Sequence, residues 1–200
     1  MTDNNFHDPS FQLLIQQPRQ VGGPQLIIAD ENLTNAPLQL LPTDKMTLVT
    51  NRYDIHEQAQ ALNLNSYFND FDFSAFEDHR FEQVLYRVSK EKPVTHHIIN
   101  NAQQLLAHNG ALILTGEKND GIKTYADKAT HFFGSLKTTK KQGNSYISII
   151  HRVNSKQQPL PEQLLDDKNY QHLRPCIPVS DQLLFSKPGL FGWNKVDQGS

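Results

Sequence analysis

Short apolar runs alternate with segments of helical periodicity between Gln25 and Val153, and this rhythm constrains the fold more than any other feature of the chain. A strand inside a parallel sheet is buried on both faces, so it appears as an unbroken apolar run such as Leu26-Ile27-Ile28-Ala29. Such runs separated by helical segments predict βαβ units. The pattern therefore predicts an α/β protein with a doubly wound, mostly parallel sheet.

The clearest βαβ unit starts with a predicted strand at Phe81–Val88. Thr95 is expected to cap a helix that runs to about Asn109. Gly110 stands where a left-handed residue would end that helix, and the apolar run 111–116 predicts the next strand. These three elements make a βαβ unit, whose crossover through the helix should be right-handed.

Six further segments complete the predicted body. They are a strand at Met46–Val49, a helix at His56–Leu64 capped by Asp54, a loop with a possible short strand at Tyr67–Phe76, a helix at Gly121–Phe133, a basic linker at Lys137–Asn144, and a last, antiparallel strand at Tyr146–Val153. This order resembles the Rossmann-like sheet of class I methyltransferases. Composition divides the chain into a polar lead-in (1–24), this body (25–154), and a proline-rich linker and junction (155–200).

A working cofactor site in such a fold needs glycines after the first strand, because the backbone must approach the ligand closely there. The chain instead has Ala29-Asp30-Glu31-Asn32-Leu33-Thr34, without a glycine. A base-modifying methyltransferase also needs polar groups after its fourth strand, commonly an Asn-Pro-Pro-aromatic run. That place is occupied by Ser89-Lys90-Glu91-Lys92-Pro93. Both features predict a degenerate cofactor site and no catalytic residue.

Charge is distributed unevenly along the chain. The net charge is -2, yet residues 118–156 carry seven lysines and one arginine against two aspartates, a net +6. Lys90 and Lys92 add cations that suit phosphate. A basic stripe on an acidic body is typical of a phosphate-binding surface, and a solvated face remains the alternative.

Metal and thiol chemistry find little support in the sequence. His96, His97 and His108 lie on one predicted helix, but no acidic residue or cysteine at i+3 or i+4 completes a metal site. The single cysteine, Cys176, excludes an internal disulfide and has no evident base partner. Without a secretory signal or an apolar run of about 20 residues, we expect a cytoplasmic protein with no membrane partner.

Three stretches together resemble the bacterial ribosomal RNA small subunit methyltransferase C family, over roughly residues 80–200. They are residues 112–123 (LILTGEKNDGIK), the Lys90–Pro93 turn, and Pro188-Gly189-Leu190-Phe191 with Val196-Asp197-Gln198-Gly199-Ser200. Members of that family modify guanine N2 in ribosomal RNA. They resemble a duplication, in which an N-terminal methyltransferase-like domain without a cofactor site precedes a catalytic domain. The resemblance implies that this chain is the N-terminal half.

The resemblance also implies roles for particular residues and partners. S-adenosylmethionine would be bound by the C-terminal catalytic domain, with Phe191, Asp197 and Gly199 shaping the entrance to its pocket. The family usually has Phe-Ser where this chain has Phe191-Gly192. This half would hold ribosomal RNA, or a ribosomal subunit, through lysines at positions Lys90, Lys92, Lys118, Lys123, Lys137, Lys140 and Lys141.

A second hypothesis comes from another class of protein. The acidic, aromatic stretch Tyr67–Phe76 could be an interface. The chain would then be an interaction or folding module that docks and stabilises its own catalytic domain without binding RNA.

Overall fold

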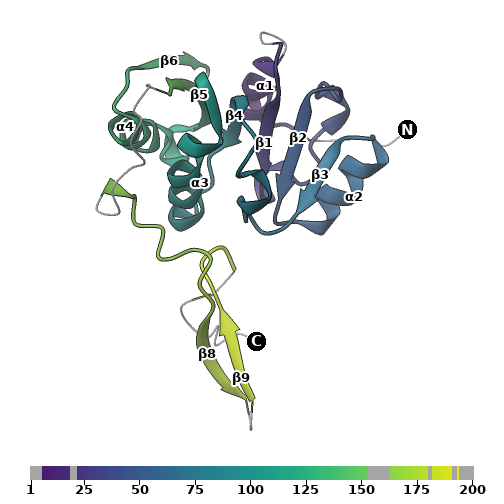
Figure 1. The fold of residues 1–200 in the computed structure, drawn as a ribbon, viewed down its shortest axis with the longest axis vertical. Coiled ribbons are helices and arrows are strands. Elements are labelled where there is room, and N and C mark those ends of the chain that lie inside the picture. Colours follow the sequence, from purple (N-terminus) through teal and green to yellow (C-terminus); the bar gives the residue numbers. More distant parts are fainter. Residues whose placement is uncertain (1–5, 19–21, 153–162, 180–181, 191–192, 194–200) are drawn as a thin grey trace.

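A computed structural model describes residues 6–18, 22–152, 163–179, 182–190 and 193. Seven strands form one sheet in the order β3-β2-β1-β4-β5-β7-β6 (Figure 1). They are β1 (Gln25–Ala29), β2 (Met46–Thr50), β3 (Asn65–Phe68), β4 (Phe81–Arg87), β5 (Leu106–Glu117), β6 (Lys137–Gln142) and β7 (Ser145–His151). Strands β1 to β5 pair in parallel, and β7 and β6 are antiparallel additions at one edge. The predicted α/β class and doubly wound sheet are confirmed.

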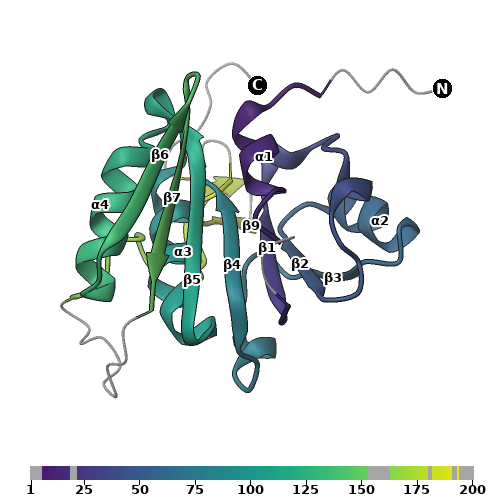
Figure 2. The ribbon, with the colours of Figure 1, turned by 90° about the horizontal axis from the view of Figure 1, so that it is seen from above.

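Helices cover both faces of the sheet (Figure 2). They are α1 (Pro9–Leu14), α2 (Tyr53–Ala61), α3 (Lys92–Leu105) and α4 (Ile122–Phe133). Leu26 and Ile28 of β1 pack into the core that contains α3 and α4, whereas Ile27 and Ala29 pack into the core that contains α1 and α2. All four side chains are fully buried, and each large one contributes about 1.5–3 kcal/mol. The unbroken apolar run at 26–29 therefore correctly predicted a strand that is buried on both faces of the sheet.

The predicted polar lead-in, residues 1–24, contains a helix that the sequence analysis did not foresee. Asp8 caps α1 by accepting hydrogen bonds from the backbone amides of Ser10 and Phe11. Phe11 and Leu14 are fully buried against the sheet. Six residues are too few to show a clear helical periodicity. The feature of the sequence that indicates this helix is its N-cap, Asp8.

Three predicted helix ends are wrong. The backbone of Glu91, not Thr95, starts α3, because Pro93 fits the first helical turn and does not force the chain away. Asp54 lies in the first turn of α2 and Arg52 precedes the helix. α3 ends at Leu105, before an extended Leu106, and not near Asn109; the left-handed residue before the apolar run is Asn109 (φ 62°), within β5, instead of Gly110.

Gly110 is needed for a different reason. A Cβ there would lie 2.9 Å from the carbonyl oxygen of Phe81 and 3.0 Å from that of Ala107. The glycine therefore allows β5 to approach β4 closely where their pairing shifts register.

The basic segment Lys137–Asn144 is a strand and turn instead of a linker. β6 pairs with β7, and Gly143 (φ 59°) lets the chain reverse between them. As an edge strand with mostly exposed side chains, β6 lacks the apolar alternation that would reveal it.

The tail forms a separate two-stranded hairpin of β8 (Arg174–Val179) and β9 (Gln182–Ser186), which extends away from the body (Figure 1). None of the helices among the described residues is long and apolar enough to cross a membrane.

Candidate functional site

The strand order reverses between β1 and β4, and folds of this kind bind ligands outside the carboxyl ends of the strands at that point. Here the point is closed by a hydrogen bond of 2.8 Å from the Tyr86 hydroxyl, on β4, to the Asp30 carboxylate, which follows β1. Both side chains are fully buried. Two buried protein side chains therefore meet at the switch point of the sheet.

The loops that follow β1 and β4 are also joined to each other. The Ser89 hydroxyl donates to the Glu31 carboxylate over 2.9 Å, and the Thr95 hydroxyl donates to the Ser89 carbonyl over 3.2 Å. After β1 the chain forms only a 3₁₀ turn, Glu31–Leu33, instead of an α-helix. This turn supplies neither a glycine-rich approach nor a long helix whose N-terminus could hold an anion.

The closed crevice changes the acidity of Asp30. Burial, and then repulsion by the neighbouring Glu31, raise the pKa of the Asp30 carboxyl group to about 7. Hydrogen bonds from the Asn32 backbone amide and from Tyr86 act in the opposite direction. Below its unfolded pKa near 3.9 this group imposes no penalty on folding. As the pH rises towards 7, ionisation of the unfolded chain is easier than ionisation of the folded chain, so stability falls.

Asp30→Asn is therefore expected to stabilise the chain by about 2 kcal/mol at pH 8 and by much less at pH 5. A shift of about three pH units corresponds to roughly 4 kcal/mol, and the amide keeps only part of the hydrogen bonding. Urea unfolding at the two pH values measures the difference. The control is Asp54→Asn, because the pKa of the exposed Asp54 carboxyl is lowered by Arg52. Equal effects of Asp30→Asn at both pH values would contradict the buried-acid explanation.

Three of the seven predicted RNA-binding lysines gather at the same end of the sheet. The Lys123 ammonium lies 4.8 Å from the centre of the Tyr146 ring, and that of Lys141 lies 5.8 Å from it. Lys118 and Lys141 line a hollow of about 240 Å³ beside Tyr146, with Glu117. The register places Lys141 next to Tyr146 and Tyr146 next to the end of β5, so the group faces the carboxyl edge.

This group, Lys118, Lys123 and Lys141 around Tyr146, is called the lysine cluster below. Its cations belong to three elements: the turn after β5, α4 and β6. Asn119 and Asn144 add amide groups to the same hollow. Cations with amide donors around a shallow hollow suit the oxygens of a phosphodiester. The tyrosine was missed by the sequence analysis, because only strand register reveals which cations surround it.

The other four predicted lysines are placed differently. Lys90 and Lys92 are exposed at the carboxyl end of β4, on the same edge of the sheet as the cluster. Lys140 is exposed on β6. Lys137 lies four positions before Lys141, about 13 Å along the strand, and pairs with Asp127. The basic stripe of the sequence is thus divided, and Lys137 is not part of the cluster.

The paired histidines of α3 hold the tail. His96 Nδ1 donates to the Asp166 carbonyl over 2.7 Å, and His97 Nδ1 lies 3.2 Å from the Asp167 carboxylate. Among the described residues, no group of histidine, cysteine and acidic side chains could hold a metal ion. Phe191, Asp197 and Gly199 lie outside the described residues, so their expected place at a cofactor pocket stays a prediction.

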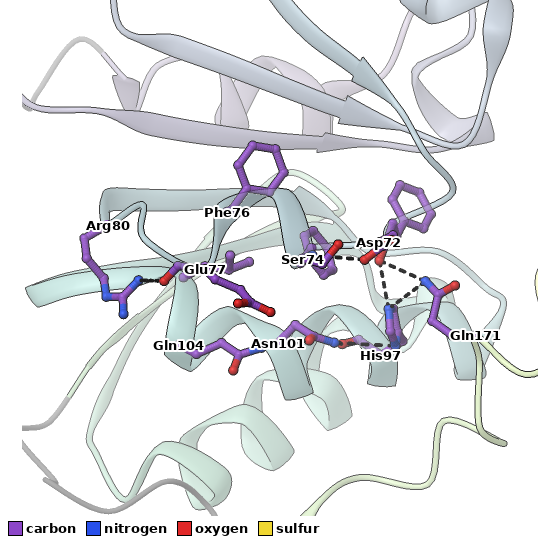
Figure 3. Close-up of a pocket in the computed structure, with 12 residues that line it drawn as sticks. Asp72, Ser74, Phe76, Glu77, Arg80, His97, Asn101, Gln104 and Gln171 are labelled. Atoms are coloured by element: carbon purple, nitrogen blue, oxygen red, sulfur yellow. Dashed lines mark hydrogen bonds between the residues drawn. The ribbon is translucent and has the colours of Figure 1, made fainter.

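The aromatic stretch that suggested an interface is mainly core. Phe71, Phe73 and Phe76 are at most 5% exposed, although Phe68 is half exposed. Beside them a cavity of about 520 Å³ lies between residues 71–80 and α3 (Figure 3). Its wall includes carboxylate, hydroxyl, amide and guanidinium groups, at Asp72, Ser74, Glu77, Arg80, Asn101, Gln104 and Gln171.

Several solved structures with a similar fold are described as methyltransferases or methylases. The 16S rRNA N2 G1207 methyltransferase of T. thermophilus, solved with AdoMet and guanosine, aligns with a TM-score of 0.70 and 16% identity over 96% of this chain. A putative rRNA methylase from Clostridium thermocellum aligns with a TM-score of 0.53 and 11% identity over 74% of this chain and 98% of its own. The PH0226 protein of Pyrococcus horikoshii OT3 aligns with a TM-score of 0.57 and 15% identity over 76% and 94%.

The chain covers only 50% of the T. thermophilus enzyme, so it spans about half the length of that relative. A search of curated protein sequences found no match. The sequence of residues 11–145, well over half of the chain, matches a family model described as the methyltransferase small domain N-terminal. That match and the T. thermophilus structure confirm the resemblance drawn from the sequence. The chain therefore belongs to the methyltransferase small domain N-terminal family.

Proposed function

We propose that this chain is the substrate-recognition and scaffold half of a longer, S-adenosylmethionine-dependent ribosomal RNA guanine-N2 methyltransferase. The observation that carries the proposal is the lysine cluster, which brings cations from three successive elements to one edge of the sheet. Lys90 and Lys92 continue the positive charge along that edge. RNA phosphates bound there would hold the substrate in register, while the chemistry takes place elsewhere.

The closed crevice supports a non-catalytic role for this half. The buried Asp30 and Tyr86 side chains fill the ligand position, and neither a glycine-rich turn nor an Asn-Pro-Pro-aromatic run is present. S-adenosylmethionine does not fit these residues, so we assign it to the remaining half of the longer protein. There the target guanine would have to leave its stack for N2 to reach the methyl group. The cytoplasm, where ribosomal RNA is found, is the compartment consistent with this role.

Lysine footprinting tests the proposal directly. The chain is treated with an acetylating reagent with and without a ribosomal RNA fragment, and modified lysines are quantified by mass spectrometry. We expect bound RNA to slow the acetylation of Lys118, Lys123 and Lys141 by roughly tenfold, because phosphate contact covers the amines. Lys45, which precedes β2 at the opposite edge, is the internal control. Uniform protection of all lysines, or none, would refute a phosphate site at the cluster.

A second candidate function rests on the hairpin of β8 and β9. Leu183, Leu184 and Phe185 follow one another on β9 and are about half exposed. Because consecutive strand residues point to opposite faces, both faces of the hairpin present apolar surface. A two-stranded hairpin is marginally stable alone, so we infer that the remaining half of the longer protein covers it. If this docking were the whole function, added RNA would not change the acetylation rates of the three lysines of the cluster.

A further inference from the structure

Tyr170, from the tail, lies at the carboxyl ends of β2 and β3. Its hydroxyl donates to the Asp70 carboxylate, just after β3, over 2.9 Å. Its oxygen also interacts with the side chain of Asn51, which directly follows β2. Tyr170 is 1% exposed. In dinucleotide-binding members of this architecture, the residue at the end of the second strand holds the ribose of the ligand. The tyrosine ring therefore lies beside the position that a nucleoside would occupy.

The Tyr170 ring is surrounded by aromatic side chains and a cation, as an aromatic ligand is in a binding site. His97 stacks on it with ring centres 4.6 Å apart and planes 26° apart, and Phe71 lies at 6.3 Å. The Lys187 ammonium lies 4.3 Å from the ring centre and pairs with Asp70. Burial is the largest cause that raises the pKa of Tyr170, and Asp70 raises it further, so the hydroxyl stays a neutral donor.

The segment that carries Tyr170 is held by one side of α3. Asn100 accepts a hydrogen bond from the Leu165 amide over 2.8 Å and donates one to the Leu165 carbonyl over 2.9 Å. This pairing imitates the backbone of a neighbouring strand. One turn earlier on α3, His96 and His97 contact the next two residues of the tail, Asp166 and Asp167. The side chain of Gln171 donates to the carbonyl of Phe71 and lies beside His97 (Figure 3).

The chain then returns over the ring. Gly189 has a φ of 92°, which favours glycine, and a Cβ there would lie 3.0 Å from the Tyr170 hydroxyl oxygen. Only a residue without a side chain can close over the ring at this point. Tyr170 is thus covered from the body by His97 and Phe71 and from the tail by Lys187 and Gly189.

We propose that the carboxyl ends of β2 and β3, beside the closed crevice, form an aromatic-ring binding site that the chain fills with its own Tyr170, which anchors the tail to the body. The tail is thereby held at both sides of the hairpin of β8 and β9. Tyr170 acts as a positioning residue, and, where it concerns the longer protein, this proposal rests on the proposed function. It accounts for the contacts that His96, His97 and Asn100 of α3 make with the tail.

The test removes the Tyr170 ring by mutation and then adds a small phenol to take its place. Tyr170→Ala leaves a cavity with the shape of a phenol, and p-cresol, the side chain of tyrosine as a free compound, is the probe. Hydrogen exchange of the Leu165 amide, followed by mass spectrometry, should become on the order of a hundredfold faster in the variant. Millimolar p-cresol should restore the slow exchange. The control is Tyr53→Ala, because Tyr53 is 58% exposed and p-cresol should have no effect there.

Unchanged exchange of Leu165 in Tyr170→Ala, or a variant that p-cresol neither binds nor restores, would overturn the proposal. If Tyr170→Ala fails to fold, Gly189→Val provides the second test, because it disturbs only the closing segment. It should speed exchange at Tyr170 and Leu165 while amides of β4 stay slow. RNA binding is measured in parallel. If the unaltered chain does not bind RNA, that result counts against the proposed function. The hydrogen-exchange results for Tyr170 would still test the anchoring proposal.

Discussion

Replacing Lys118, Lys123 and Lys141 together with glutamate is expected to weaken the binding of ribosomal RNA by at least about a hundredfold at 0.1 M salt. Each phosphate contact releases condensed counterions and contributes roughly a factor of five to ten at this salt concentration. Three contacts therefore account for a hundredfold or more, and the new negative charges add repulsion. The measurement is equilibrium binding of a labelled RNA fragment to the 200-residue chain.

A charge-matched control separates a local site from the effect of net charge. The control replaces Lys45, Arg80 and Lys137 with glutamate, which changes the net charge equally. Lys45 and Arg80 precede β2 and β4, at the amino ends of the parallel strands, and Lys137 pairs with Asp127. We expect this control to lose less than about tenfold in affinity, since distant charges are screened. Equal losses in the two triple variants would mean that RNA responds to net charge alone.

Arg87→Ala is expected to destabilise the chain by about 3–5 kcal/mol. The guanidinium pairs with Asp8 at 2.9 Å and with Asp120 at 2.8 Å, and it also donates to the Val88 carbonyl. Both carboxylates are largely shielded from water, with side chains 16% and 5% exposed. Removing the cation leaves these charges without their partner, which is the costly way to break a buried ion pair.

Asp8 caps α1, so loss of Arg87 should also loosen that helix from the sheet. Urea unfolding measures the change. Arg52→Ala is the matched control, because the Arg52–Asp54 pair is 41% and 49% exposed and such pairs contribute about 0–1 kcal/mol. Similar losses for Arg87→Ala and Arg52→Ala would show that the buried pair does not join α1 to the body.

The central strands could be predicted because burial on both faces leaves a direct mark on the sequence. Leu26–Ala29 and Ala111–Leu114 are apolar at every position and pack into the two cores. Edge elements leave no such mark. β6 is polar on both faces, and α1 is too short for a period, so neither could be recognised from pattern alone.

The lack of a glycine-rich turn after β1 can be read from the sequence, whereas the side chains that pack at the switch point cannot. The missing glycine after Ala29 shows that a backbone cannot approach a ligand there. Tyr86 and Tyr170, which fill the space, are far from that turn in sequence and meet it only through strand order and tail docking. The same reason explains His96 and His97, whose partners lie 70 residues away.

The lysine cluster shows how strand register decides which residues of a basic segment lie together. A count of charges finds seven lysines and one arginine between residues 118 and 156 but cannot tell which of them face one another. The pairing of Lys141 with Tyr146, and of Tyr146 with Gly116, brings one end of β6 to the carboxyl edge. The same pairing carries Lys137 away from it.

The most direct test of the account is the salt dependence of RNA affinity for the chain and for its Lys118, Lys123 and Lys141 glutamate variant. If the cluster holds phosphates, the logarithm of the binding constant of the unaltered chain should fall steeply with the logarithm of salt. The slope of the variant should be shallower by about two to three, since each phosphate contact contributes about 0.7–0.9. Affinity that ignores salt, or the same slope in both proteins, would contradict a phosphate-binding role for this half.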